Sequence, residues 1–321
     1  AMRKSYLLVA AALLVAASCQ KNDNASSVEE IKYNPVDVVL SAAIESVDTK
    51  VGYTEDANAL KAAWKAGDKI SLVAIDASGK VLSNDVFETT TAGPVAKFNG
   101  TYSNPDGAVM VSVFYPALTQ GKGTDAEPWE CENNVLFNLI SGKKFLNISS
   151  FRHKYQDVNA DPAFLSKSVV MKGKISDMSA FMSGAAKTTL KNTCYIIKTT
   201  VTLPSTVTKA SEVSLVASSS SITVVGWTAV DDRFLSYYGG AAPNDYSEIS
   251  TRLGNFAPAS DGTVTAWMIG YGANKKEVTS GETLTMSVTT DQGVISRVKT
   301  LASNITFEPG KIYRLTVDMT K

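Results

Sequence analysis

The chain has 321 residues, of which 44% are hydrophobic and 19% are charged, and its formal net charge at pH 7 is zero. This balance argues against the strongly basic surface of a nucleic-acid-binding protein, so we expect no nucleic-acid partner. The single histidine, His153, rules out a zinc site built from two or three histidines of one chain.

The first residues predict a removable export signal. Arg3 and Lys4 precede an apolar run over residues 6–17. As a helix this run would span roughly 18 Å, well short of the ~30 Å hydrocarbon core of a bilayer. We therefore predict a signal peptide over residues 1–18.

Cys19 follows this run directly, and Ala16-Ala17-Ser18-Cys19 resembles a bacterial lipoprotein box, although that box usually carries Leu where Ala16 stands. The resemblance implies cleavage before Cys19 and lipidation of Cys19, which would anchor the protein in the cell outer membrane. An ordinary secretory signal, with Cys19 as an incidental thiol, is the alternative. Residues 20–30 hold one large apolar side chain, so we predict a flexible tether over residues 19–30.

Beyond the tether the sequence has the pattern of short β-strands. Apolar runs occupy residues 36–40 and 70–75, and the cleanest alternation of apolar and polar residues covers 284–289 and 313–319. One face of a further strand would carry four apolar residues, namely Val109, Val111, Val113 and Tyr115. Turn signals such as Asp261-Gly262 and Pro309-Gly310 separate the runs. This pattern predicts an all-β fold of antiparallel sandwiches.

Helical signals are scarce. Residues 57–64 predict a turn or two of helix, and residues 161–165 predict another. The stretch from Lys172 to Asn192 is poor in large apolar residues, and we place a domain boundary near residue 190. Two domains result, at 31–190 and 191–321.

No catalytic motif accompanies this fold. The sequence contains neither a Gly-x-Ser-x-Gly elbow nor a glycine-rich phosphate-binding motif. We therefore predict no enzymatic activity and no cofactor. Cys131 and Cys194 lie in an exported chain, where they could form a disulfide or remain two buried thiols, and the sequence leaves both readings open.

Tyr237 and Tyr238 are the candidate ligand-binding residues. They precede Gly239-Gly240 in a loop-like stretch and belong to the densest group of aromatic residues, which could form a sugar-binding platform. Packing of these aromatic side chains in the core or at its rim is the alternative.

Three stretches resemble the fimbrillin family, the exported pilus subunits and anchors of Bacteroidetes. Asp48-Thr49-Lys50 followed by Trp64-Lys65-Ala66-Gly67-Asp68-Lys69-Ile70 resembles the family's Thr-Arg and Trp-x-x-Gly-Asp-x-Ile. Thr263 to Ile269 resembles a strand of its second domain, and Phe307 to Val317 resembles its closing Phe-x-x-Gly-Lys-x-Tyr. The resemblance implies two transthyretin-like antiparallel β-sandwich domains in tandem.

The resemblance also implies assembly with other pilus subunits by donor-strand exchange, in which a protease removes the first strand and another subunit's strand fills the groove. Family members that polymerise are commonly cut after an Arg, but no Arg occurs between Arg3 and Arg152. Lys50 and Lys32 are therefore the candidate cleavage sites. The C-terminal strand could complete its own sheet or serve as a donor.

Two functions follow as hypotheses. The first is a surface-exposed lipoprotein that acts as a fimbrial subunit, tip or anchor and contributes to adhesion to a host or bacterial surface ligand, either in the outer membrane or in the fimbrium. The second is a lipid-anchored surface glycan-binding protein that uses Tyr237 and Tyr238.

Overall fold

The structure is a computed structural model. It describes residues 31–44, 54–56, 59–61, 63–117, 135–139, 145–150, 153–162, 165, 168–224, 227–228, 245–272 and 275–321. The described residues from Tyr33 onward belong to one compact unit. Among the described residues, no helix has the length and apolar character needed to cross a membrane.

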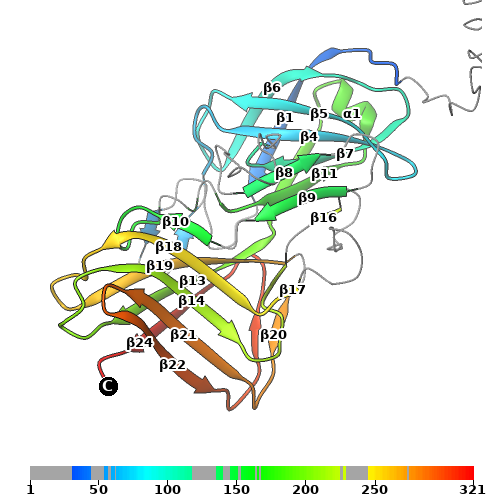
Figure 1. The fold of residues 1–321 in the computed structure, drawn as a ribbon. Coiled ribbons are helices and arrows are strands. Elements are labelled where there is room, and N and C mark those ends of the chain that lie inside the picture. The colour runs from blue at the N-terminus through cyan, green and yellow to red at the C-terminus, as the bar shows by residue number, and fades with distance from the viewer. Residues whose placement is uncertain are drawn as a thin grey trace, which may run out of the picture. The chain divides into compact units, whose positions relative to one another are not determined.

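Strands of the first part of the chain close into a barrel in the order β1-β12-β11-β7-β4-β5-β6 (Figure 1). Their bounds are β1 (Val36–Ile44), β4 (Lys69–Asp76), β5 (Val81–Thr89), β6 (Val95–Tyr102), β7 (Ala108–Tyr115), β11 (Met171–Ile175) and β12 (Lys187–Asn192). The largest fully buried side chains here are aromatic, namely Trp64, Phe87, Phe98, Tyr102, Phe114 and Phe181.

Two sheets of the later chain pack face to face around a second core. The order β10-β18-β14-β21-β22 makes one sheet, and β19-β13-β24 makes the other. Their bounds are β10 (His153–Gln156), β13 (Cys194–Thr202), β14 (Ala210–Ala217), β18 (Glu248–Phe256), β19 (Thr263–Tyr271), β21 (Thr283–Thr290), β22 (Gly293–Thr300) and β24 (Ile312–Asp318). One buried cluster joins Ile197 and Met268 of the three-stranded sheet to Leu215 and Met286 of the other.

Short elements complete the described chain. They are β2 (Thr54–Asp56), β3 (Ala59–Lys61), β8 (Val135–Leu139), β9 (Phe145–Ser150), β15 (Thr223–Val224), β16 (Trp227–Thr228), β17 (Asp245–Tyr246), β20 (Lys276–Val278), β23 (Ile305–Phe307) and α1 (Met178–Met182). The prediction of helix at 57–64 is wrong, because β3 pairs antiparallel with β2 there. The described helix α1 begins at Met178 and is capped by Asp177, whose side chain accepts the Ala180 N–H at 2.9 Å.

The prediction of an all-β fold is confirmed, but the pairing is not purely antiparallel. β1 runs parallel to β12, β10 parallel to β18, and β13 parallel to β24. Each of these pairs joins strands that are far apart in the sequence, where no short hairpin dictates direction. β10 precedes residue 190, yet it belongs to the sheet built by β14, β18, β21 and β22.

The predicted alternation has a mixed outcome. In β21 the inward residues Leu284, Met286 and Val288 are buried and alternate with half-buried polar residues, as predicted. In β7 the predicted face is buried except for Val109, which is 48% exposed. On its opposite face Met110, Ser112 and Phe114 are buried as well, so β7 packs on both sides over most of its length.

Candidate functional site

β1 occupies a slot between two other strands of the barrel. It pairs antiparallel with β6 from Val36–Tyr102 to Ala43–Val95, and parallel with β12 from Ser41–Lys187 to Ile44–Leu190. Both backbone edges of β1 are therefore engaged. Its removal would leave unpaired N–H and C=O groups on β6 and β12.

The inward face of β1 is apolar and buried. Val38, Leu40, Ala42 and Ile44 alternate along it, and none of them is more than 8% exposed. Burial of a Val, Leu or Ile side chain contributes roughly 1.5–3 kcal/mol, so the three larger residues together hold β1 in place by about 5–9 kcal/mol before any entropy is counted. A strand held in this way would stay in the barrel after a backbone cut until another strand replaced it.

Trp64 fastens β1 from inside the barrel. Its indole N–H donates to the main-chain carbonyl of Ala42 at 2.9 Å, and the side chain is fully buried. The ring makes edge-on contacts with Phe98 at 4.9 Å and Tyr115 at 5.3 Å between centroids. A bridge of two main-chain hydrogen bonds with Gly93 fixes the backbone of Trp64. The Trp thus links β1 to several other elements.

The turn after Trp64 accounts for the rest of the Trp-x-x-Gly-Asp pattern. Gly67 has a φ of +89°, a backbone conformation that would be strained for a residue with a side chain. Its N–H donates to the Thr89 carbonyl at 2.7 Å. The Asp68 carboxylate accepts the Lys65 N–H at 2.7 Å. Burial raises the pKa of Asp68, and the bond from Lys65 acts in the opposite direction. The motif therefore positions Trp64 rather than building a reactive centre.

The residues just before β1 are tied to the barrel as well. Tyr33 forms an isolated bridge with Pro105, and its hydroxyl donates to the Leu82 carbonyl at 3.3 Å. The Asn34 side-chain amide donates to Asp106 at 3.1 Å. The contacts that hold β1 therefore begin at Tyr33, directly after Lys32.

The structure places few of the residues that the sequence singled out. Lys32 is exposed and lies in no strand. Cys194 is buried at the start of β13. The other candidates lie outside the described residues, and their predictions remain predictions: Cys19, Lys50, Cys131, Tyr237 and Tyr238. No group of three or more metal-ligating side chains occurs in the described part of the chain.

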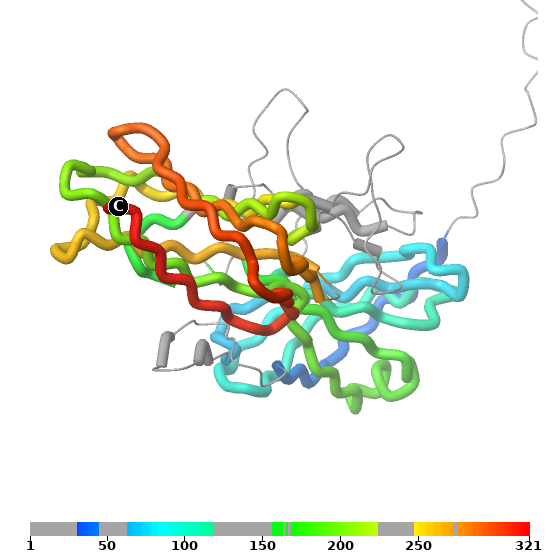
Figure 2. The backbone as a smooth tube through the Cα atoms, turned by 90° about the horizontal axis from the view of Figure 1, so that it is seen from below, coloured from blue at the N-terminus to red at the C-terminus, as the bar shows by residue number. Residues whose placement is uncertain are grey.

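The C-terminal strand completes its own sheet. β24 pairs parallel with β13 from Ile196–Ile312 to Thr202–Asp318, and the Met319 N–H donates to the Thr202 carbonyl at 2.9 Å. Figures 1 and 2 both show β24, coloured red, along one side of the sandwich next to β22. The Tyr313 ring packs against Phe307 at 5.0 Å. The sequence left open whether this strand completes its own sheet or serves as a donor. In the structure it completes its own sheet.

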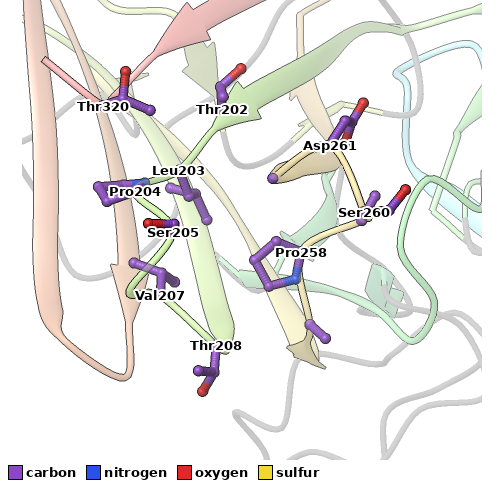
Figure 3. Close-up of a pocket in the computed structure, with 13 residues that line it drawn as sticks. Thr202, Leu203, Pro204, Ser205, Val207, Thr208, Pro258, Ser260, Asp261 and Thr320 are labelled. Atoms are coloured by element: carbon purple, nitrogen blue, oxygen red, sulfur yellow. The ribbon is translucent and has the colours of Figure 1, made fainter.

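A hollow of 860 Å³ lies at one end of the sandwich. Figure 3 shows Pro204 and Thr320 on one side of it and Pro258, Ser260 and Asp261 on the other. The Asp261 carboxylate accepts the hydroxyl of Thr263 at 2.6 Å, and this bond lowers the pKa of Asp261. The lining is mostly hydroxyl groups and proline rings, which select no particular ligand.

One relationship at these sites was not predicted from the sequence. The contact between Trp64 and Ala42 joins residues 22 positions apart, and the Trp motif gave no sign of its partner. The regular apolar alternation at Val38, Leu40, Ala42 and Ile44 was the one available signal that β1 has a buried face.

No protein-family model and no curated protein matches the chain. Among solved structures, a candidate cell adhesion protein from Bacteroides uniformis aligns with a TM-score of 0.43 and 14% identity, over 88% of this chain and 93% of that one. The fimbrial anchor protein Mfa2 from Porphyromonas gingivalis aligns with a TM-score of 0.34 and 14% identity, over 83% of each chain. A fimbrial assembly protein from Parabacteroides distasonis has a TM-score of 0.38 and 11% identity, over 88% of this chain and 91% of that one.

None of these three structures is described as an enzyme. Fimbrial and cell adhesion proteins are thus among the structural matches, as the resemblance to fimbrillins predicts. The likeness is distant and concerns the arrangement of the chain, so no residue role is transferred from it.

Proposed function

We propose that this chain is a surface-exposed fimbrial subunit, tip or anchor that assembles with other pilus subunits by strand complementation and contributes to cell adhesion. In this proposal Cys19 carries the lipid that holds the protein in the outer membrane. The barrel and the sandwich correspond to the two transthyretin-like domains that the fimbrillin resemblance implies.

The position of β1 carries the proposal. It is the first strand of the described chain, it is hydrogen-bonded on both edges, and its inward face is buried. A single backbone cut after β1 would therefore sever its covalent link to the rest of the barrel without interrupting any other described strand. The slot left behind would offer the unpaired backbone groups of β6 and β12, together with apolar pockets, to an incoming strand.

The two candidate cleavage sites would have different consequences. A cut at Lys32 would detach residues 1–32 and leave Tyr33, Asn34 and β1 in place. A cut at Lys50, after the end of β1 at Ile44, would allow an incoming strand to displace β1 together with the lipid on Cys19. An anchor would keep both, whereas a polymerising subunit would lose both, so the fate of β1 decides the role.

Treatment of the delipidated chain with a trypsin-like protease tests the proposal. We expect multimers that withstand detergent and dissociate on heating, because exchanged strands are held only by non-covalent contacts. The same treatment of Lys50→Gln should yield monomers, whereas Lys32→Gln should still yield multimers. Persistent monomers after a clean cut at Lys50 would count against a polymerising role.

A further inference from the structure

The inward side chains near Trp64 are small on three neighbouring strands. Ala42 of β1 lies opposite Ala96 of β6 and beside Thr188 of β12 in the strand register. All three side chains are less than 10% exposed, so all three face the packed interior. Because Ala42, Ala96 and Thr188 are small, they leave space inside the barrel at the height of Ala42. The fully buried indole of Trp64 donates its hydrogen bond to the Ala42 carbonyl there.

The neighbouring levels are bulky. Leu40 pairs with Phe98 on one side of this level, and Ile44 pairs with Leu190 on the other. The ring of Phe98 also touches Trp64. The indole is therefore bounded by large side chains and has room only over the small ones, because protein interiors are close-packed.

We propose that Trp64 determines which strands the slot accepts. The structure assigns the slot a pattern of four inward residues, of which the first, second and fourth are bulky and the third is Ala or another residue of its size. The indole N–H adds a hydrogen bond to the carbonyl of that third residue, and the need for a small side chain at this position favours one register of the strand. The biological meaning of this selectivity rests on the proposed function.

The pattern also defines the partner. Tyr313, Leu315, Val317 and Met319 alternate along and just beyond β24, and none of them is as small as alanine. The other face of β24 carries Ile, Arg, Thr and Asp. In the β1 register, β24 of a second copy would set a large residue against Trp64, so the slot should favour an extended strand with the β1 pattern.

A double-mutant cycle on the full chain tests the assignment by urea unfolding. Ala42→Leu should lower the folding equilibrium constant about tenfold or more, because added methylene groups overpack the barrel next to Trp64. In a Trp64→Leu background the same change should raise that constant, because the new side chain fills the space the indole has left. A change of the same sign and size in both backgrounds would overturn the proposal.

Ala43→Leu is the matched control. Ala43 faces outward beside the half-exposed Val95, so its effect should be small and equal in both backgrounds. If Trp64→Leu does not fold alone, folding of the variant that also carries Ala42→Leu supports the proposal, and failure of that double variant to fold contradicts it.

Peptide binding separates this inference from the proposed function. A peptide of residues 36–44 should bind the chain cut at Lys50 at least tenfold more tightly than the same peptide with Ala42→Leu. Equal binding of both peptides would contradict the role of Trp64. Binding of neither would contradict strand exchange, while the mutant cycle would still decide the role of Trp64.

Discussion

The side-chain amide of Gln156 pairs with the backbone of β19 at Trp267. Its oxygen accepts the Trp267 N–H at 3.0 Å, and its nitrogen donates to the Thr265 carbonyl at 3.0 Å. Asn159 continues the arrangement by accepting the Thr265 N–H at 2.9 Å. In the described sheet order β13 is the strand neighbour of β19, so these amides satisfy its other edge as a strand would.

Gln156→Leu should therefore lower the free energy of unfolding by about 1–3 kcal/mol, because it leaves the Trp267 N–H buried without this partner. The Thr265 carbonyl would keep the Ala160 N–H as a partner, at 3.2 Å. Urea unfolding measures the loss. Asp157→Ala, at an exposed neighbouring position, is the control and should change little. Equal effects of the two substitutions would mean that the amide does not hold this edge.

Two buried threonines should respond oppositely to the same substitution. The Thr199 hydroxyl faces the sandwich core without a hydrogen-bond partner among the described residues, whereas the Thr251 hydroxyl donates to the Trp267 carbonyl at 2.8 Å. We expect Thr199→Val to raise the free energy of unfolding by about 1 kcal/mol and Thr251→Val to lower it by a similar amount. Thermal unfolding of both variants tests this, and destabilisation by Thr199→Val would contradict it.

Gly270 should tolerate no side chain. It lies opposite Tyr195 in the pairing of β13 with β19, and a Cβ atom there would overlap the Tyr195 ring. That ring is fixed by stacking on Phe307 at 4.8 Å and by a hydrogen bond from its hydroxyl to the Ile222 carbonyl. Gly270→Ala should therefore cost about 1–3 kcal/mol of unfolding free energy through overpacking.

The loss of unfolding free energy caused by Gly270→Ala should be smaller when the Tyr195 ring is removed. In a Tyr195→Leu background, Gly270→Ala should cost less than it does alone, which urea unfolding of the four chains would measure. Strictly additive effects would show that the ring is not what excludes the side chain.

Glu282 should make part of the stability depend on acid pH. Its carboxylate accepts hydrogen bonds from Ser220 and Thr279, which lower its pKa from 4.5 to about 2. Because the folded-state pKa is depressed, the contribution is present above about pH 4.5 and is lost as the pH falls toward 2. Chemical unfolding between pH 2 and 6 should show a shallower dependence in Glu282→Gln. An unchanged slope would contradict this assignment.

Sequence patterns predicted the elements whose burial follows from local alternation. The burial of Leu284, Met286 and Val288 could be predicted without knowing their partner strands. A strand with one buried face carries an apolar residue at every second position. The alternation of apolar residues in β24 was predicted in the same way, although these residues are only half-buried. The all-β class followed from many such runs.

Pairing between distant strands could not be predicted in this way. The stretch around Lys172 to Asn192 had the composition of a boundary, yet β11, α1 and β12 lie within or at its edge, and β12 is the parallel neighbour of β1. Short strands rich in Lys and Thr carry a weak apolar signal, so tertiary pairing decides their conformation. The bond between Trp64 and Ala42 is hidden from sequence for the same reason.

Replacement of β1 by a labelled copy tests the central claim most directly. The chain, before and after a cut at Lys50, would be incubated with an isotope-labelled peptide of residues 36–44, and native mass spectrometry would report whether the peptide takes the place of the cleaved fragment. The account predicts incorporation into the cut chain only, with hydrogen-exchange protection of β6 retained. A clean cut at Lys50 without incorporation, or equal incorporation into the uncut chain, would contradict it.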